Sequence, residues 1–139
     1  MLPPPIHSLA VIVSAIVGMI IGGAWYSPAL FGNDWMKLSG ITPQRAKAAQ
    51  KKGMGKSYAL TFLGTIIMAF ILSAIVKWVD AQTFGQGAAV AFWLWIGLIL
   101  PVHLNSVLWE GKSWKLYWIN VMYYLVTLII MGGILASWG

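Results

Sequence analysis

The chain has no cysteine and only three acidic residues in a length of 139 residues. Without a thiol, disulfides, thiolate catalysis and cysteine-ligated metal sites are all excluded. Charged residues of both signs together make up 9% of the chain. Soluble domains carry roughly a quarter, so a water-soluble fold is not expected. The length leaves room for a single domain, which we take as residues 1–139.

In place of charge, the chain has four long apolar segments. They lie at about residues 6–26, 57–77, 87–109 and 115–137, each near the roughly 20 residues that cross a bilayer as a helix. The first segment has no Lys or Arg before it and is longer than the apolar region of a typical signal peptide. We therefore expect it to be a retained span. The predicted fold is all-α, a four-helix transmembrane bundle.

Basic residues gather on one side of these segments. Lys112 and Lys115 follow the third span, whereas the turn after the second span has only Lys77 and Asp80. Loop 27–56 is the most basic, with Lys37, Arg45, Lys47, Lys51, Lys52 and Lys56. The positive-inside rule predicts that this loop is cytoplasmic, and that both termini of a multi-pass cell-membrane protein are outside.

The first half of the basic loop has the pattern of a short amphipathic helix. Ser27 and Pro28 suit its N-cap and first turn, and Phe31, Trp35 and Leu38 recur at i, i+4 and i+7 within residues 28–39. This spacing predicts a helix that lies on the cytoplasmic interface.

Aromatic rings close the first span just before this helix. Trp25 and Tyr26 stand at the span end, where amphipathic rings favour the level of the lipid headgroups. With the helix that follows, they form a predicted interfacial motif whose members are Trp25, Tyr26, Pro28, Phe31 and Trp35.

The second half of the loop predicts another short helix, which begins at Thr42-Pro43 and ends at Gly53. It has no apolar face, so we interpret it as a solvated basic linker. No aromatic interleaving indicates a nucleic-acid partner, and we expect none. The side chains expected to contact anionic headgroups of the lipid bilayer are Arg45, Lys47, Lys51 and Lys52.

Small residues recur at helical spacing in the first two spans. Ser14, Gly18 and Gly22 lie four residues apart, and Thr61 and Thr65 repeat the interval in the second span. Small residues on one face let another helix approach closely, so these five are predicted helix-packing positions. The same faces offer a route to a homo-oligomer.

The third span contains the most polar intramembrane stretch of the chain. Pro101 removes a helix hydrogen bond and is expected to kink the segment. His103 and Asn105 follow at once, and Glu110 ends the span. His103 and Glu110 are seven residues apart and share a face, whereas Asn105 is displaced by about 200° around the helix.

The fourth span brings polar side chains to a matching depth. His103 and Asn120 each lie about six residues, roughly 9 Å, from the cytoplasmic boundary. We therefore predict a polar layer centred on them, and polar groups inside a bilayer are candidate functional sites. Hydrogen bonds that fix helix register would explain the layer as well. The candidate site comprises His103, Asn105, Glu110, Asn120 and Tyr124.

The sequence contains no motif for metal binding, phosphate binding or nucleophilic catalysis. Two histidines and three acids give no metal-ligand spacing, and no phosphate loop or nucleophile elbow is present. Intramembrane hydrolysis needs paired acids or an activated nucleophile, and the three acids lie in loops or at span ends. We assign no catalytic, cofactor-binding or metal-binding residue, expect no cofactor, and find that the sequence does not favour an enzyme.

Two stretches resemble a known family. Residues 22–40, GGAWYSPALFGNDWMKLSG, are similar to the glycine, Trp-Tyr-x-Pro, Phe-Gly and Trp signature of the family called domain of unknown function 1761. Residues 108–138 resemble its closing segment, with an acidic-Gly-basic turn, an Asn in the following helix and a Gly-rich end. The resemblance implies a small integral membrane protein with about four spans and no assigned activity. It places in a shared pattern Trp25, Tyr26, Pro28, Phe31, Gly32, Trp35, Glu110 and Asn120.

Three classes of function remain open. The packing stripes favour a non-enzymatic bundle that assembles with itself or with a membrane partner. A small transporter or channel would use the polar layer around His103 and Asn120, and needs a water-filled cavity at that depth. A membrane enzyme that acts on a lipid or quinone needs a lateral cleft that reaches His103 or Glu110.

Overall fold

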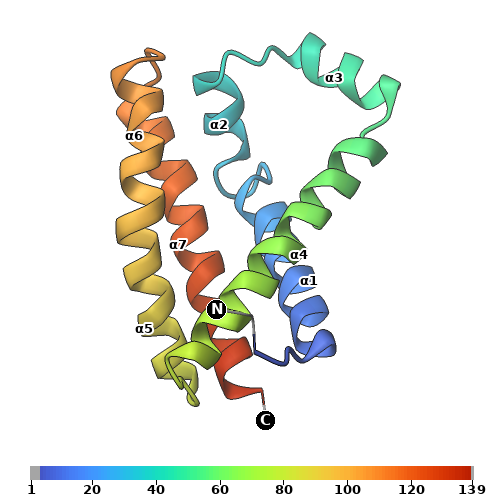
Figure 1. Ribbon diagram of the computed structural model, residues 1–139. Coiled ribbons are helices and arrows are strands. Elements are labelled where there is room, and N and C mark those ends of the chain that lie inside the picture. Colours follow the sequence, from blue (N-terminus) through green and yellow to red (C-terminus); the bar gives the residue numbers. More distant parts are fainter. Residues whose placement is uncertain (1–3, 139) are drawn as a thin grey trace.

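The computed structural model describes residues 4–138, and every regular element in that range is a helix. Four helical segments are long and apolar enough to cross a membrane, so the predicted all-α bundle is confirmed (Figure 1). The third of these, Phe84–Leu108, is built from three consecutive pieces, α5, η1 and α6. In chain order the elements are α1 (Ser8–Trp25), α2 (Gly32–Leu38), α3 (Pro43–Lys52), α4 (Gly55–Trp78), α5 (Phe84–Leu94), η1 (Trp95–Ile99), α6 (Leu100–Leu108) and α7 (Trp114–Ser137).

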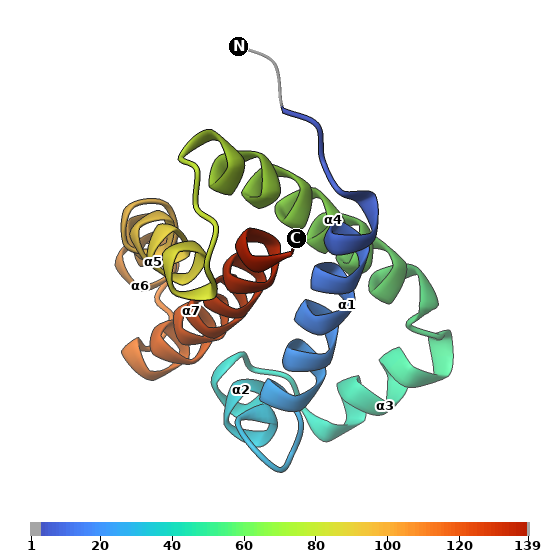
Figure 2. The same cartoon turned by 90° about the horizontal axis from the view of Figure 1, so that it is seen from below.

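Helix α7 is the centre of the bundle. It packs against α1 and α4 on one side and against α5 on the other (Figure 2). Its buried residues include Val121 and Met131, which have no exposed surface. The core of the described residues continues onto the other three segments through small side chains, Ala15, Ala69 and Ala91.

The contact between α5 and α7 depends on two facing glycines. A Cβ atom on Gly87 would overlap the carbonyl oxygen of Gly132, and one on Gly132 would lie 2.6 Å from the carbonyl oxygen of Gly87. The two backbones therefore touch directly, a packing that only small residues permit.

The third membrane-length segment is irregular one turn before its proline. Residues Trp95–Ile99 form a π-helical turn, and the Leu100 N–H donates to the Trp95 carbonyl, five residues back. The wider turn accommodates Pro101, which follows at the start of α6. Two side-chain bonds fix this region on α7: Trp95 Nε1 donates to Val121 O at 2.7 Å, and Tyr117 Oη donates to Leu100 O at 2.8 Å.

Helix α2 begins at Gly32 and not at Pro28, so the expected first turn at Ser27-Pro28 is wrong. Ser27 does not act as an N-cap, because its Oγ donates backwards to Ala24 O at 2.7 Å. The Gly32 N–H donates to Ser27 O at 2.8 Å and closes a tight loop ahead of the helix. A Cβ on Gly32 would overlap the Tyr26 carbonyl, so the loop requires glycine there.

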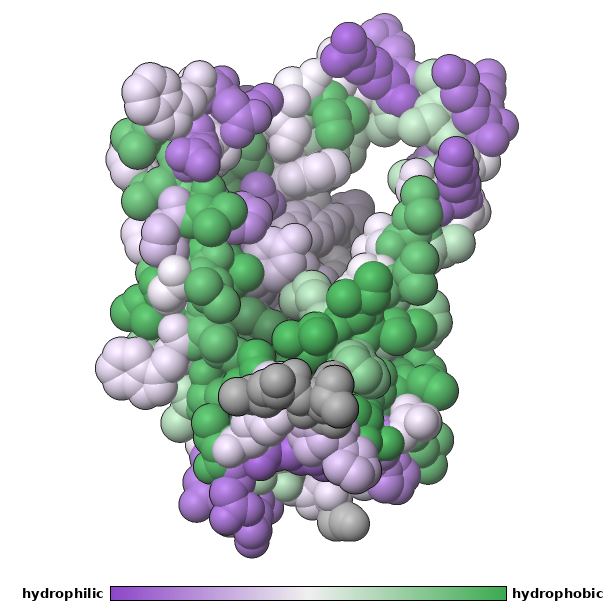
Figure 3. All heavy atoms as spheres, in the orientation of Figure 1, coloured by the Kyte–Doolittle hydropathy of each residue, from purple (hydrophilic) through white to green (hydrophobic). Residues whose placement is uncertain are grey.

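Helix α3 has the caps that the sequence predicts. Thr42 Oγ1 accepts from the Arg45 N–H at 3.1 Å, Pro43 occupies the first turn, and Gly53 ends the helix with φ +87°. Helices α2 and α3 lie at the same end of the bundle as the turn between α6 and α7, which carries Lys112 (Figure 1). We call this the basic end; hydrophilic side chains gather at both ends of the visible face, with an apolar band between them (Figure 3).

Helix α4 leans away from α7 toward the basic end (Figure 1). Its buried residues begin at Thr65 and continue to Val76, whereas residues 55–61 are all exposed. The half of α4 near the basic end therefore stands apart from the bundle that the other half helps to form.

Candidate functional site

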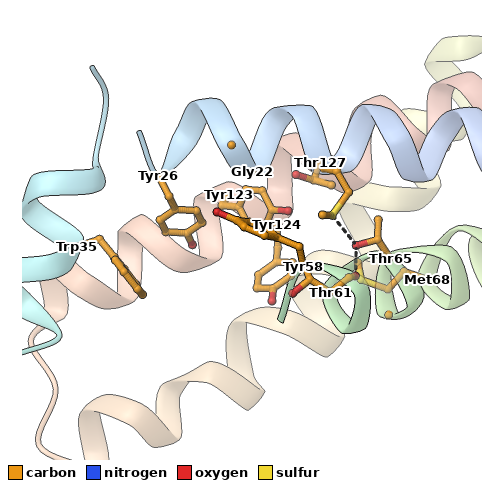
Figure 4. A pocket seen from close by; sticks show the side chains of 13 residues that line it. Gly22, Tyr26, Trp35, Tyr58, Thr61, Thr65, Met68, Tyr123, Tyr124 and Thr127 are labelled. Carbon is orange, nitrogen blue, oxygen red and sulfur yellow. Dashed lines mark hydrogen bonds between the residues drawn. The ribbon is translucent and has the colours of Figure 1, made fainter. Parts of the chain in front are cut away.

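The divergence of α4 opens a cleft of about 700 Å³ between α1, α4 and α7. The hollow is visible between α4 and the rest of the bundle in Figure 3, and Figure 4 shows its side chains in close-up. The lining residues come from α1 and its C-cap residue Tyr26, and from α2, α4 and α7. They are Met19, Gly22, Gly23, Tyr26, Trp35, Tyr58, Thr61, Gly64, Thr65, Met68, Tyr123, Tyr124 and Thr127.

One wall of the cleft is a single face of α4. Its members include Tyr58, Thr61, Thr65 and Met68, which recur every three or four residues. The two threonine hydroxyls are already satisfied. Thr61 Oγ1 donates to Ser57 O at 2.8 Å. Thr65 Oγ1 donates to Thr61 O, also at 2.8 Å (Figure 4). This wall therefore presents mainly methyl groups, a thioether and one phenol.

The opposite wall depends on the glycines of α1. A Cβ on Gly22 would lie 3.0 Å from the Tyr123 hydroxyl, so the glycine leaves room for that ring of α7. Tyr123 Oη donates to Gly18 O at 3.4 Å. The predicted packing residues thus act differently: Gly18 lets Thr65 of α4 pack closely against α1, while Gly22 leaves room for an aromatic side chain of α7.

Aromatic rings form a continuous row along this wall. The ring centroids of Tyr124 and Tyr123 are 5.1 Å apart, those of Tyr123 and Tyr26 are 5.3 Å apart, and those of Tyr26 and Trp35 are 5.7 Å apart. His103 of α6 extends the row behind the cleft, 5.3 Å from Tyr124. These separations are those of favourable aromatic pairs.

The floor of the cleft is where the three helices meet. Met19, Thr65 and Thr127 line this end, and a Cβ on Gly18 would touch the methyl groups of both threonines. Thr127 is only 1% exposed, and its Oγ1 makes no hydrogen bond within residues 4–138. Ser14 of α1 is the other such hydroxyl in that range, fully buried and outside the lining of the cleft.

The loop after α1 is bonded directly to α7. Trp25 Nε1 donates to Ile119 O at 3.0 Å, and Tyr26 Oη donates to Asn120 Oδ1 at 2.8 Å. The two motif stretches, residues 22–40 and 108–138, therefore meet through Tyr26 and Asn120. Sequence reasoning did not pair them, because it placed Tyr26 at the level of the headgroups and Asn120 roughly 9 Å deeper in the bilayer.

The structure brings only some residues of the predicted polar layer into contact with one another. His103 and Tyr124 lie ring against ring and are half-buried. Asn120 is half-buried as well, but its amide oxygen accepts a hydrogen bond from the Tyr26 hydroxyl and not from His103 or Tyr124. Asn105 and Glu110 are exposed, away from these contacts. The packing position Thr61 is exposed along the cleft, whereas Ser14 and Thr65 are buried between helices.

The cleft suits binding better than acid–base chemistry. None of its lining residues is charged, and neither His103 nor Glu110 is among them. Within residues 4–138 no three His, Asp or Glu side chains lie close enough together to hold a metal ion. What the lining offers is apolar and aromatic surface with a few hydroxyl groups, the composition of a site for an uncharged amphiphile.

Comparison with known proteins gives one match. The model of a family described as protein of unknown function (DUF1761) matches residues 9–136, nearly the whole chain. The resemblance inferred from the two motif stretches is thereby confirmed. No curated protein and no solved structure matches the chain.

Proposed function

The chain belongs to the DUF1761 family of proteins of unknown function, and we propose that it is a non-enzymatic membrane protein that binds an uncharged amphiphile in the cleft between α1, α4 and α7. The observation that carries the proposal is the cleft itself, about 700 Å³ in volume and without a charged lining residue. Ligand pockets commonly measure roughly 300–1,000 Å³ and combine mostly apolar walls with a few polar groups.

The position of the cleft supports entry from the bilayer. Tyr58, at the free half of α4, is 59% exposed, and residues 55–61 are all exposed. In a membrane this half of α4 would have lipid on both sides, unless a ligand fills the cleft. An amphiphile dissolved in the bilayer could enter sideways, without crossing water.

The basic end supports an orientation for the whole protein. By the positive-inside rule it faces the cytoplasm, with both termini outside. Helix α3 has no buried residue and would lie near the headgroups, where Arg45, Lys47, Lys51 and Lys52 attract anionic lipid. Labelling of a cysteine introduced at Lys47, with an impermeant reagent added to either side of sealed vesicles, tests this orientation.

Filling the cleft should abolish binding while leaving the fold intact. Gly64 lines the cleft, and a Cβ placed there meets no atom within 4 Å, so Gly64→Trp introduces a large ring into open space. Gly97 is exposed, also has open space around its Cβ, and lies outside the lining. Gly97→Trp is therefore the matched control.

The probe is a long-chain alcohol with a photoreactive diazirine, added to the full chain in lipid nanodiscs. We expect saturable crosslinks at cleft residues of the wild type and of Gly97→Trp, and at least about a fivefold loss in Gly64→Trp, since a filled cleft excludes the probe. Crosslinks spread over the exposed apolar surface, equal in all three proteins, would overturn the proposal.

A further inference from the structure

Resting on the proposed function, we propose that the ligand carries a planar, uncharged ring with carbonyl oxygens, the chemistry of a membrane quinone, and that the Thr127 hydroxyl binds one of these oxygens at the floor of the cleft. The hydroxyl groups, the aromatic wall and the absence of charge in the lining all favour the binding of such a ring.

Thr127 is the residue that points to a polar group on the ligand. Threonines inside helices usually satisfy their hydroxyl by donating to the carbonyl three or four residues back, as Thr61 and Thr65 do here. Thr127 is 1% exposed and makes no such bond within residues 4–138. Buried polar groups are normally hydrogen-bonded, so a ligand acceptor at this point would complete the site.

The lining also sets which hydrogen-bonding group fits. Its polar side-chain groups are hydroxyls and the indole N–H of Trp35, and all of these are donors. Four of the hydroxyls, those of Tyr26, Thr61, Thr65 and Tyr123, already donate within the protein. The hydroxyls of Thr127, Tyr58 and Tyr124 are the ones left to donate to a ligand. The lining holds no carboxylate, side-chain amide or imidazole to act as a dedicated acceptor. A ligand that brings acceptor oxygens is the natural complement, and a charged phosphate would be buried without a counterion.

The aromatic row favours a ligand that carries a ring over a ligand that is only an acyl chain. Tyr123, Tyr124, Tyr26 and Trp35 follow one another along one wall, with centroid spacings of 5.1–5.7 Å. Met68 lies on the α4 wall and Met19 at the floor, and thioethers make favourable contacts with π systems. Figure 4 shows that the row leads from Trp35 toward the threonines. An acyl chain would fill volume here but leave the Thr127 hydroxyl without an acceptor.

The decisive variant removes the Thr127 hydroxyl and keeps its shape. Thr127→Val is nearly isosteric, and because the hydroxyl makes no hydrogen bond among the described residues 4–138, the change should not lower resistance to unfolding. Ser14→Ala is the matched control, since Ser14 is equally buried and its hydroxyl makes no hydrogen bond in the part of the chain that the structure describes, but it does not line the cleft.

Binding is followed by the quenching of tryptophan fluorescence when decylubiquinone is added to the full chain in nanodiscs, with decylbenzene as a competitor that has a ring and a tail but no carbonyl. We expect Thr127→Val to weaken decylubiquinone binding about fivefold, the loss of one hydrogen bond, and Ser14→Ala to leave it unchanged. Decylbenzene should compete at least about tenfold more weakly.

Unchanged affinity in Thr127→Val, or equal competition by decylbenzene, would overturn this inference. The proposed function would still stand if the diazirine alcohol labelled the cleft. If the cleft instead captured an acyl chain alone or a helix of a second protein chain, with no saturable decylubiquinone binding, the inference would fail. Absence of cleft labelling by the alcohol as well would overturn both.

Discussion

Trp25 and Tyr26 each donate a side-chain hydrogen bond that joins residues 22–40 to residues 108–138. The Tyr26 hydroxyl donates to Asn120 Oδ1 at 2.8 Å, and the neighbouring Trp25 donates to the backbone of α7. Lys115 and Asp34 add an exposed ion pair at 3.4 Å between α7 and α2. The ion pair contributes little in water, so the half-buried hydrogen bonds of Trp25 and Tyr26 are what hold this loop on α7.

Removal of the Tyr26–Asn120 bond should destabilise the protein modestly and specifically. Tyr26→Phe and Asn120→Leu are each expected to lower the free energy of unfolding by about 1 kcal/mol, the usual size of an interhelical hydrogen bond in membranes. The double variant should cost less than the sum of the two. Unfolding in mixed detergent micelles with added SDS measures all three.

Tyr58→Phe is the control for this cycle, because Tyr58 faces the cleft and is 59% exposed. It should unfold like the wild type. Strict additivity of the Tyr26 and Asn120 changes would show that the two side chains do not interact.

At the scale of elements, the backbones of α5 and α7 touch directly where the two helices cross. Gly87 and Gly132 face each other there with no room for a methyl group on Gly87. Gly85, two residues earlier on α5, has open space where a Cβ would lie, with no atom within 4 Å, and so tolerates a side chain.

Gly87→Ala should therefore separate α5 from α7, at a cost of about 1–3 kcal/mol typical of overpacking. Gly85→Ala should be neutral or stabilising by up to about 1 kcal/mol, because alanine is the better helix former. The same SDS titration compares the two variants. Equal stabilities would contradict the close glycine contact.

The sequence predicted elements well wherever local chemistry decides them. Hydropathy was sufficient for the four membrane-length helices, and Thr42 and Gly53 marked the caps of α3 because both act within a few residues. The start of α2 was wrong, since Ser27 bonds backwards to Ala24 and the chain makes a tight loop up to Gly32. That choice depends on docking against α7, which a local pattern does not encode.

The candidate site was harder to predict, because it depends on how helices lean. The polarity of His103 and Asn120 was visible in the sequence, but their partners, Tyr124 and Tyr26, follow from the arrangement of three helices. The apolar run of α4 gives no sign that half of it leaves the bundle. Thr127 has the same residue type as Thr61, and only the packing around it distinguishes a buried hydroxyl without a partner.

In the molecule as a whole, α4 diverges from α7 toward the basic end and so keeps an uncharged cleft open (Figure 1). At the opposite end, Leu72 and Val76 of α4 share one core with Met131 and Leu135 of α7. Packed helices lie about 8–10 Å apart. The molecule is therefore closed at one end and open at the other.

Pulsed electron paramagnetic resonance between spin labels on α4 and α7 tests this shape most directly. The chain has no native cysteine, so labels attach only where cysteines are introduced. Lys56→Cys with Trp118→Cys reports on the basic end, and Val79→Cys with Ser137→Cys reports on the closed end; all four positions are exposed. In nanodiscs we expect a clearly longer label-to-label distance for the first pair than for the second. Equal short distances for both pairs would mean that α4 packs along its whole length and that the cleft does not exist in a bilayer.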